Sequence, residues 1–593
     1  MKHRYLWWGF IIIGLILILA TLTMSQIHAQ DGGDEEEKEY YGARVCGECH
    51  SDLRSDQRET HHGLTLQEVD EETVFEPFDQ GEDARMVQFP GSGTPRALQL
   101  EDVAFIIGSG RNVQRFLYAV AEDEYQVLPV EWNVVEQKWQ PFQLAESWPD
   151  PAYDWTQNCA YCHTTGLNLE RGRWEDEGVQ CEACHGPGSL HVDIVDEVGS
   201  RPTPEELQQI RDAIYVSPDA QVCGQCHSQG MDADGIHPYP TQYLPGDDLF
   251  AAFTLVAEDD PAHWWATGHA SQKYMQFNEW TKSAHSQALT NAKDQDFASD
   301  ECLRCHSADY GFTERIIALT EEGKRDGDPP ALPTLDTAQY GVTCSGCHNP
   351  HNVESQGALI TEDAYTSCIS CHNTQDLPVI HHPNQEMFEG LTIIENVEGI
   401  PSAHFTAENG PDCVTCHLPA VPVGEGNRLS HTFQPILPGE AMNVEGLLDS
   451  CTTCHEEQAD QAGMQQLIDD VQTSTQTRLE AARAAVSENS PEWITAALDF
   501  IEGDGSLGIH NYSYSNAMLG AVEKELNIAP ETDEGPQLSP APTGTTPTTD
   551  EETAVTEEET GLATQSVIII VACLLAMAVA GWVFFVKQKG SAQ

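Results

Sequence analysis

The sequence predicts a mainly α-helical chain with long loops, a small antiparallel β insertion, C-terminal helices and one transmembrane helix. Three observations support this prediction. Pairs of cysteines separated by two residues recur along most of the chain, in segments with little regular periodicity. Residues 84–143 lack such pairs and alternate apolar with polar residues, which is typical of strands. The C-terminal part shows helical periodicity followed by a long apolar run.

The β insertion is predicted from the stretch "RFLYAVAEDEYQVLPVEWNVVEQKWQPF", which is rich in Val, Tyr, Phe and Trp. Turn signals at Asp123–Glu124 and Glu136–Gln137 divide it into strands. We therefore expect a small antiparallel sheet within residues 84–143.

The C-terminal helices are predicted from spacing and capping signals. A first helix should bury one face; its apolar residues are Met464, Leu467, Ile468, Val471 and Leu479. Ser490 is expected to cap a second helix with Pro491 at its first position, ending near Gly503. A third helical piece is expected at about residues 514–527.

Both ends of the chain carry export or membrane signals. Residues 1–29 hold basic residues, an apolar run and small residues, so they form either a signal peptide cleaved after Ala29 or an uncleaved N-terminal anchor. Residues 566–586 are apolar and, at about 20 residues, can cross about 30 Å of hydrocarbon. The acidic stretch 551–559 precedes this run and lysines follow it, which predicts a cytoplasmic tail at 587–593 and an extracytoplasmic bulk.

The linker and the location follow from these signals. Residues 529–565 are rich in Pro, Thr and Glu and are too polar to pack, so they are expected to be an extended linker. We therefore expect a bacterial or archaeal cell-membrane protein with a single-pass C-terminal anchor.

The charge is strongly negative, with 95 acidic against 28 basic residues and a formal net charge of −67. Such a chain repels nucleic acid and anionic lipid, so neither is expected as a partner. The charge serves either solubility, including adaptation to salt, or the steering of a basic redox partner.

Nine cysteine pairs share one motif, because a histidine directly follows the second cysteine of every pair. A four-thiolate zinc site or a redox dithiol starts with the same spacing but does not require that histidine. C-x-x-C-H is the attachment signature of c-type haem. In chain order, the nine pairs are Cys46/Cys49, Cys159/Cys162, Cys181/Cys184, Cys223/Cys226, Cys302/Cys305, Cys344/Cys347, Cys368/Cys371, Cys413/Cys416 and Cys451/Cys454.

Each motif supplies two thiols that bind the vinyl groups of one porphyrin and a histidine that binds its iron from the proximal side. We therefore expect nine covalently attached haems c, with the helices and loops organised around them. Four motifs lie in residues 30–240 and five in 241–528, which predicts an N-terminal four-haem region and a C-terminal five-haem region. The expected proximal ligands are His50, His163, His185, His227, His306, His348, His372, His417 and His455.

Thirteen further histidines follow the leader, enough to give every haem a second histidine. Iron with two histidine ligands has no vacant position, so such a haem transfers electrons rather than binding substrate. In "CSGCHNPH", His351 lies three residues after His348 and stays on the same side of that haem. If His351 is a ligand, it must therefore serve a neighbouring haem.

Several segments resemble one superfamily of multihaem cytochromes c. They are "CEACHGPGSLH" at 181–191, "WTKSAHSQA" and "CLRCHS" within 280–307, "SAHFTAENGPDCVTCHLP" at 402–419, "SHTF" at 430–433 and "GIHNYSYSNAML" at 508–519. The superfamily contains the nitrifiers' tetrahaem cytochrome, ammonia-forming nitrite reductase and octahaem hydroxylamine oxidoreductase. The chain departs from it in having nine motifs and no C-x-x-C-K motif.

The resemblance implies closely stacked haems and distal ligands supplied by remote segments. The distal candidates that it implies are His62, His191, His285, His351, His404, His431 and His510, with His61, His237, His263, His269, His381 and His382 in reserve.

Two functions remain open from the sequence. The first is an electron carrier that connects a membrane quinol-oxidising complex with a soluble or extracellular acceptor. The second is a hydroxylamine- or nitrite-type oxidoreductase that acts on a small nitrogen or sulfur compound at one haem with an open site. A third alternative, a polymerising filament, is disfavoured because a membrane anchor on every subunit would obstruct stacking.

Overall fold

The computed structural model describes residues 38–529, except 71–72, 75–76, 354–359, 361–362, 375–379, 425 and 457–458. The predicted leader, membrane-spanning segment and tail, and the linker beyond Ala529, lie outside these residues. Within the described ranges, no helix has both the length and the apolar character needed to span a bilayer. The expected mixture of helices, loops and small antiparallel sheets is confirmed.

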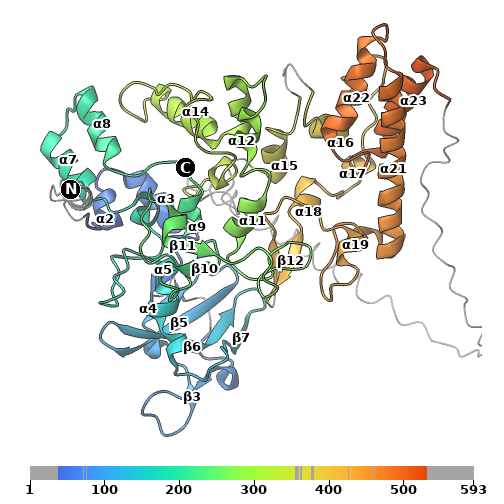
Figure 1. The fold of residues 1–593 in the computed structure, drawn as a ribbon. Coiled ribbons are helices and arrows are strands. Elements are labelled where there is room, and N and C mark those ends of the chain that lie inside the picture. Colours follow the sequence, from blue (N-terminus) through green and yellow to red (C-terminus); the bar gives the residue numbers. More distant parts are fainter. Residues whose placement is uncertain are drawn as a thin grey trace, which may run out of the picture. The chain divides into compact units, whose positions relative to one another are not determined.

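The largest sheet has five antiparallel strands in the order β1-β4-β5-β6-β7 (Figure 1). Asp123 and Gln137 adopt positive φ angles of 59° and 51° in the turns that join β5 to β6 and β6 to β7, where the sequence predicted turns. The strands are β1 (Leu66–Glu68), β4 (Phe105–Ile107), β5 (Val113–Ala121), β6 (Glu124–Asn133) and β7 (Lys138–Pro141). Strand β1 lies before the predicted insertion at 84–143. It was not predicted, because three residues are too few to show a periodicity.

Both faces of this sheet are buried, so its strands do not have the solvent-exposed polar face that simple alternation predicts. On one face Phe116 packs with Trp132 and Trp139. On the other, Leu117 packs with Trp155 and Ala160, beside and within the second C-x-x-C-H motif. The sheet therefore covers that motif.

The C-terminal helices are α21 (Gln461–Ala485), α22 (Glu492–Asp504) and α23 (Tyr512–Leu526), which pack together (Figure 1). The predicted apolar face of α21 is buried, apart from the partly exposed Leu467. The predicted cap of α22 is wrong by one residue: Pro491 is the N-cap and the helix begins at Glu492. The Ser490 hydroxyl instead accepts a hydrogen bond from the Ser487 N–H at 3.0 Å.

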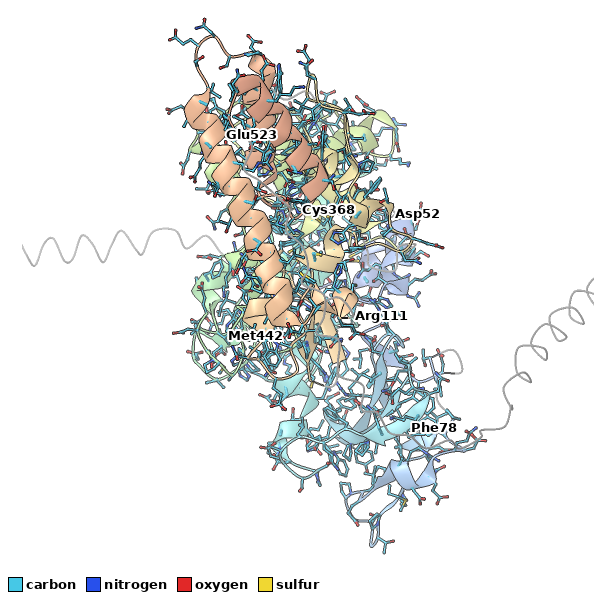
Figure 2. All side chains as sticks on the ribbon, turned by 90° about the vertical axis from the view of Figure 1, so that its right-hand side faces the viewer. Asp52, Phe78, Arg111, Cys368, Met442 and Glu523 are labelled. Atoms are coloured by element: carbon cyan, nitrogen blue, oxygen red, sulfur yellow. The ribbon has the colours of Figure 1, made fainter. Side chains whose placement is uncertain are left out.

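A buried ion pair joins two of these helices. Arg478 of α21 donates two hydrogen bonds to Glu523 of α23, at 2.7 and 2.9 Å, and both side chains are 8% exposed. Glu523 is labelled in Figure 2, where these helices lie side by side. Each charge of this pair would be left buried and unpaired if α21 and α23 separated, so the pair depends on the packing of these two helices.

The rest of the described chain consists of short elements joined by loops. The remaining helices are α2 (Ala43–Cys46), α3 (Ser51–Glu59), α4 (Trp155–Asn158), α5 (Ala160–His163), α6 (Cys181–His185), α7 (Ser189–Val198), α8 (Pro204–Asp212), α9 (Gln221–Gly224), α10 (Leu249–Ala252), α11 (Gln276–Lys282), α12 (Ala288–Lys293), α13 (Leu303–His306), α14 (Ala308–Glu321), α15 (Ala364–Ile369), α16 (Asn384–Glu389), α17 (Ala403–Thr406), α18 (Cys413–His417), α19 (Pro438–Ala441) and α20 (Thr452–His455). The 3₁₀ turns are η1 (Glu82–Arg85), η2 (Leu100–Asp102), η3 (Pro151–Tyr153), η4 (Asp300–Cys302) and η5 (Cys344–Gly346). Two-stranded antiparallel pairs are formed by β2 (Met86–Val87) with β3 (Arg96–Ala97), β8 (Thr164–Thr165) with β9 (Asp176–Glu177), β10 (Gly230–Asp232) with β11 (Phe253–Leu255), and β12 (Ala420–Val423) with β13 (Gly426–Leu429).

Candidate metal centres

The C-x-x-C-H motifs lie on single helical turns. In the sixth motif, the Cys347 N–H donates to the Cys344 carbonyl at 3.2 Å and the His348 N–H donates to the same carbonyl at 2.8 Å. This turn brings residues three apart onto one face, so both thiols lie on the same side of the turn. The histidine is the next residue in the chain after the second thiol. The eighteen described cysteines form no disulfide. The motifs therefore present the thiol pair and the imidazole that covalent haem attachment requires.

Most motif histidines face a histidine from a remote segment. Two imidazoles that bind one metal at about 2 Å each hold their ring centres roughly 6 Å apart. The motif histidines that meet this test, each with its partner and ring-centre distance, are His185 with His351 (6.1 Å), His227 with His62 (6.1 Å), His306 with His381 and His382 (6.3 Å each), His348 with His431 (6.4 Å), His372 with His285 (6.1 Å) and His382 (5.6 Å), His417 with His510 (5.9 Å) and His455 with His404 (6.0 Å).

His50 of the first motif lies near His191. Burial and the positive charge that His191 can carry both lower the pKa of His50. His191 itself is held by the Ile210 carbonyl, 2.8 Å from its Nδ1. Each of the seven first-choice distal residues thus lies near a motif histidine. The seven motif histidines that they face belong to seven different motifs.

The partners of Nδ1 orient several of these rings. A metal-binding histidine usually donates its other N–H to a carbonyl or a carboxylate, which fixes the ring and directs the free nitrogen at the metal. His185, His306 and His417 place Nδ1 at 2.8–3.1 Å from a backbone carbonyl. This arrangement leaves Nε2 free to bind iron.

The electrostatic environment keeps several rings neutral, which is the form that binds metal. Burial, together with the facing His227, lowers the pKa of His62 to about 4. Burial and His348 lower the pKa of His431 to about 4 in the same way.

His510 is the exception. Burial acts to lower its pKa, but the Asp504 carboxylate, 2.7 Å from Nδ1, more than offsets this and the pKa is raised. Asp504 is buried at the end of α22 and also accepts a hydrogen bond from Asn384. No sequence pattern predicted a role for this carboxylate, because Asp504 meets His510 only when tertiary packing closes the loop between them.

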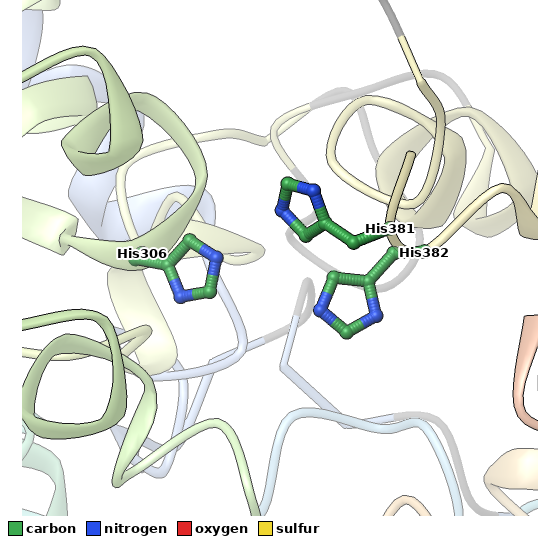
Figure 3. A group of neighbouring side chains, drawn as sticks. All are labelled: His306, His381 and His382. Atoms are coloured by element: carbon green, nitrogen blue, oxygen red, sulfur yellow. The ribbon is translucent and has the colours of Figure 1, made fainter. Parts of the chain in front are cut away.

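The fifth motif has two candidate partners. His306 lies opposite the adjacent residues His381 and His382, and the three rings offer ligand nitrogens within 4.8 Å of one another (Figure 3). Both were reserve candidates in the sequence. The sequence already implied that a reserve histidine would be needed as a distal ligand, because seven first-choice residues cannot serve nine motifs.

The remaining reserve histidines face no motif histidine within the described chain. Both ring nitrogens of His269 are engaged, by Thr267 at 2.9 Å and by the Gln434 carbonyl at 3.1 Å. His263 is paired with Asp260 at 2.8 Å. His237 lies against the Tyr239 ring at 5.2 Å, and His61 lies near Arg111.

Thiols of different motifs contact one another and reveal which motifs are neighbours. The thiol contacts are Cys46 with Cys181, Cys162 with Cys226, Cys223 with Cys344, Cys305 with Cys371, and Cys368 with Cys413. Electrostatic interactions add Cys184 with Cys223, Cys347 with Cys368, and Cys416 with Cys454. The motifs therefore follow one route in the order first, third, fourth, sixth, seventh, eighth and ninth. The second motif branches from the fourth, and the fifth branches from the seventh.

The first and ninth motifs, at the two ends of this route, each have a solvent-exposed cysteine. Cys49 of the first motif and Cys454 of the ninth are exposed, whereas the other described cysteines are partly buried. Cys368 of the seventh motif, labelled in Figure 2, contacts Cys413 of the eighth motif and interacts electrostatically with Cys347 of the sixth.

The zinc alternative has no support in the described part of the chain. His306, His381 and His382 form the one cluster there of three or more potential metal ligands. "CAYCH" and "CEACH" do not come together as a four-thiolate site. The donor sets fit haem, with paired thiols on one side and facing imidazoles for its iron.

Comparisons with known proteins agree with this assignment. Two family models match, one described as a doubled C-x-x-C-H motif over residues 338–377 and one as cytochrome c554 and c-prime over residues 132–186. No curated protein matches the chain in sequence.

Solved structures match over much longer stretches. Outer cell wall cytochrome OcwA is 28% identical, with a TM-score of 0.66, over 82% of this chain and 99% of that one. The undecahaem cytochrome from the S-layer of Carboxydothermus ferrireducens is 19% identical, with a TM-score of 0.51, over 84% of this chain and 70% of that one, which shows a shared fold. Cytochrome c nitrite reductase from Desulfovibrio desulfuricans is 13% identical over 41% of this chain and 70% of that one, and its TM-score of 0.27 is too low to support an argument.

Proposed function

We propose that this chain, a multihaem c-type cytochrome, is a membrane-anchored electron carrier with nine haems that moves electrons along a continuous route on the extracytoplasmic side. The observation that carries the proposal is the continuous series of thiol contacts and electrostatic interactions between motifs, which starts and ends at motifs with an exposed cysteine. The haem iron supplies the one-electron chemistry, and the protein supplies spacing and ligands.

In this proposal eight irons have two histidine ligands. The distal ligands are His62, His191, His285, His351, His404, His431 and His510, and either His381 or His382 completes the eighth. Six-coordinate iron has no vacant site and changes little on reduction, which suits electron transfer.

The exposed first and ninth motifs are the proposed points of electron input and output. One would receive electrons from a membrane quinol-oxidising complex, and the other would pass them to a soluble or extracellular acceptor. Two features support a cell-surface location: the predicted C-terminal anchor at 566–586 and the similarity to a cytochrome described as belonging to the outer cell wall. We also propose membership of the cytochrome c554 superfamily, supported by the match at residues 132–186.

The test is a coulometric titration of the purified full chain together with haem quantification. The proposal predicts nine haems per chain and nine electrons taken up reversibly. A haem count below nine, or a fraction of haems that the electrode cannot reach, would refute it.

A further inference from the structure

Residues 391–405 expose four large apolar side chains, more than any other stretch of fifteen residues in the described chain. They are Leu391, Ile393, Ile400 and Phe405, each 36–44% exposed. Single apolar side chains are ordinary on a protein surface, whereas several from one short segment indicate an interaction site.

This segment is held in place by the C-terminal helices. The Tyr514 hydroxyl donates to the Leu391 carbonyl at 2.8 Å, and the Asn511 side-chain amide donates to the Ile400 carbonyl at 2.6 Å. Ile394 of the same segment is buried in the core that these helices form. The exposed side chains are therefore presented by a fixed backbone, so a partner that binds them pays little to order it.

The segment adjoins the ninth motif, at one end of the proposed electron route. Phe405 directly follows His404 on α17, and His404 faces His455 of that motif. The Phe405 ring also packs on Phe388 of α16, with ring centres 5.6 Å apart. Figure 1 shows α16 and α17 beside the C-terminal helices. Because Cys454 of the same motif is exposed, this surface lies where the route reaches solvent.

The charge around these apolar side chains has one sign. Between Arg325 and Arg428 the sequence has no lysine or arginine, against fourteen acidic residues. Glu395, Glu398 and Glu408 are exposed within or directly after the segment. A surface of this kind attracts a cationic partner, and it repels anionic lipid and a second copy of the same acidic chain.

We propose that residues 391–405, together with Glu408, form the docking surface for a small soluble redox protein whose cofactor edge is ringed by lysines or arginines. This proposal deepens the proposed function and rests on the electron route ending at the ninth motif. The apolar side chains meet the partner's cofactor edge and the carboxylates meet its basic ring, which gives an apolar centre and a polar rim. Residues 392–398 also line an open hollow of about 470 Å³, large enough to receive a side chain of the partner.

The first experiment maps the contact by cross-linking with a water-soluble carbodiimide, which joins carboxylates to lysines that touch them. The probe is mitochondrial cytochrome c, a small basic haem protein, mixed with the full chain at low ionic strength. Mass spectrometry should find its lysines joined to Glu395, Glu398 or Glu408, and salt at about 0.5 M should suppress the products. Cross-links confined to other carboxylates would overturn the docking surface.

The second experiment measures electron transfer from the chemically reduced chain to the same ferric probe by stopped flow. Each transfer oxidises one haem of the chain and reduces one probe molecule by a single electron. It runs downhill because the methionine ligand of the probe raises its potential above that of haems with two histidines.

Glu395→Gln/Glu398→Gln should lower the second-order rate constant about fivefold at low ionic strength, the effect of losing two exposed ion pairs. The difference should largely disappear at about 0.5 M salt. Glu258→Gln/Asp259→Asn is the matched control, because it removes the same charge from two exposed residues of another loop. Equal effects of the two double variants would refute local docking and leave only attraction by the overall charge.

Ile393→Ser tests the apolar part of the surface and should lower the rate constant at both ionic strengths, because salt does not screen an apolar contact. Ile236→Ser is the matched control, since Ile236 is also exposed and lies outside the segment. Equal effects of these two variants would contradict the proposal. So would a dimer of the full chain in detergent that Ile393→Ser dissociates, because a second copy would then cover this surface.

The outcomes distinguish this proposal from the proposed function, because cross-linking does not depend on electron flow. Uptake of nine electrons by a chain that cross-links elsewhere would overturn the docking surface and leave the electron route intact. Cross-links at the three glutamates, in a chain some of whose haems the electrode cannot reach, would overturn the route and retain the docking surface.

Discussion

Replacing Asp504 with asparagine should raise the reduction potential of the haem held by His417 and His510. Asp504 Oδ1 lies 2.7 Å from His510 Nδ1, and its side chain is 1% exposed, so solvent does not screen its charge. A carboxylate in this position makes the imidazole a stronger donor and stabilises ferric over ferrous iron. Asparagine keeps an oxygen for the same hydrogen bond and removes the charge.

The size of the shift follows from the lost charge. A charge-assisted hydrogen bond is about twice as strong as a neutral one, which contributes about 1 kcal/mol. Adding the lost Coulomb attraction in a partly shielded interior gives about 1 to 2 kcal/mol favouring the ferric state. For one electron, 59 mV corresponds to about 1.4 kcal/mol, so the potential should rise by roughly 40 to 80 mV.

The assay is a spectroelectrochemical titration of the full chain. The difference between the wild-type and Asp504→Asn curves should integrate to one haem in nine. Asp260→Asn is the matched control, because Asp260 contacts His263 at a similar 2.8 Å and that histidine faces no motif histidine. An unchanged or lowered potential, or an equal effect of Asp260→Asn, would refute the reasoning.

Three further predictions follow from the contacts. His351→Ala should leave the haem of His185 without its histidine partner and add one high-spin haem to the EPR spectrum, with the haem count unchanged; an unaltered spectrum would contradict the pairing. Arg478→Met should lower the free energy of unfolding by about 3 to 5 kcal/mol, since it leaves a buried carboxylate unpaired, whereas adding Glu523→Leu should recover most of the loss in denaturant titrations. Deleting residues 566–593 should move the haem protein from the membrane to the soluble fraction when the leader has been cleaved after Ala29, which N-terminal sequencing checks; retention of a cleaved chain in the membrane would argue against the C-terminal anchor.

The sequence predicts the attachment sites but only part of the ligand pairing. C-x-x-C-H is a local motif, so its chemistry can be derived from adjacent residues. The sequence also predicted that His351, if it is a ligand, must serve a haem other than that of His348, and the structure places it beside His185. Which haem it serves depends on tertiary packing across more than 150 residues of chain, and no local pattern encodes that.

Other features could not be derived for similar physical reasons. The sheet was expected from its alternation and turns. Burial of its second face could not be predicted, because it depends on the second motif packing against Leu117. Asp504 has the sequence context of an ordinary surface carboxylate. Its role depends on a loop that returns to a helix end and brings His510 beside it.

The measurement that tests the electron route most directly removes its central link. The sixth motif contacts the fourth through Cys344 and interacts electrostatically with the seventh through Cys347, so it connects the two halves of the route. Fast-scan voltammetry of electrode-bound wild-type protein should show all nine haems exchanging electrons. In a Cys344→Ala/Cys347→Ala variant that carries eight haems, only about half of them should respond at the same scan rates. A full response of all eight would contradict the proposed route.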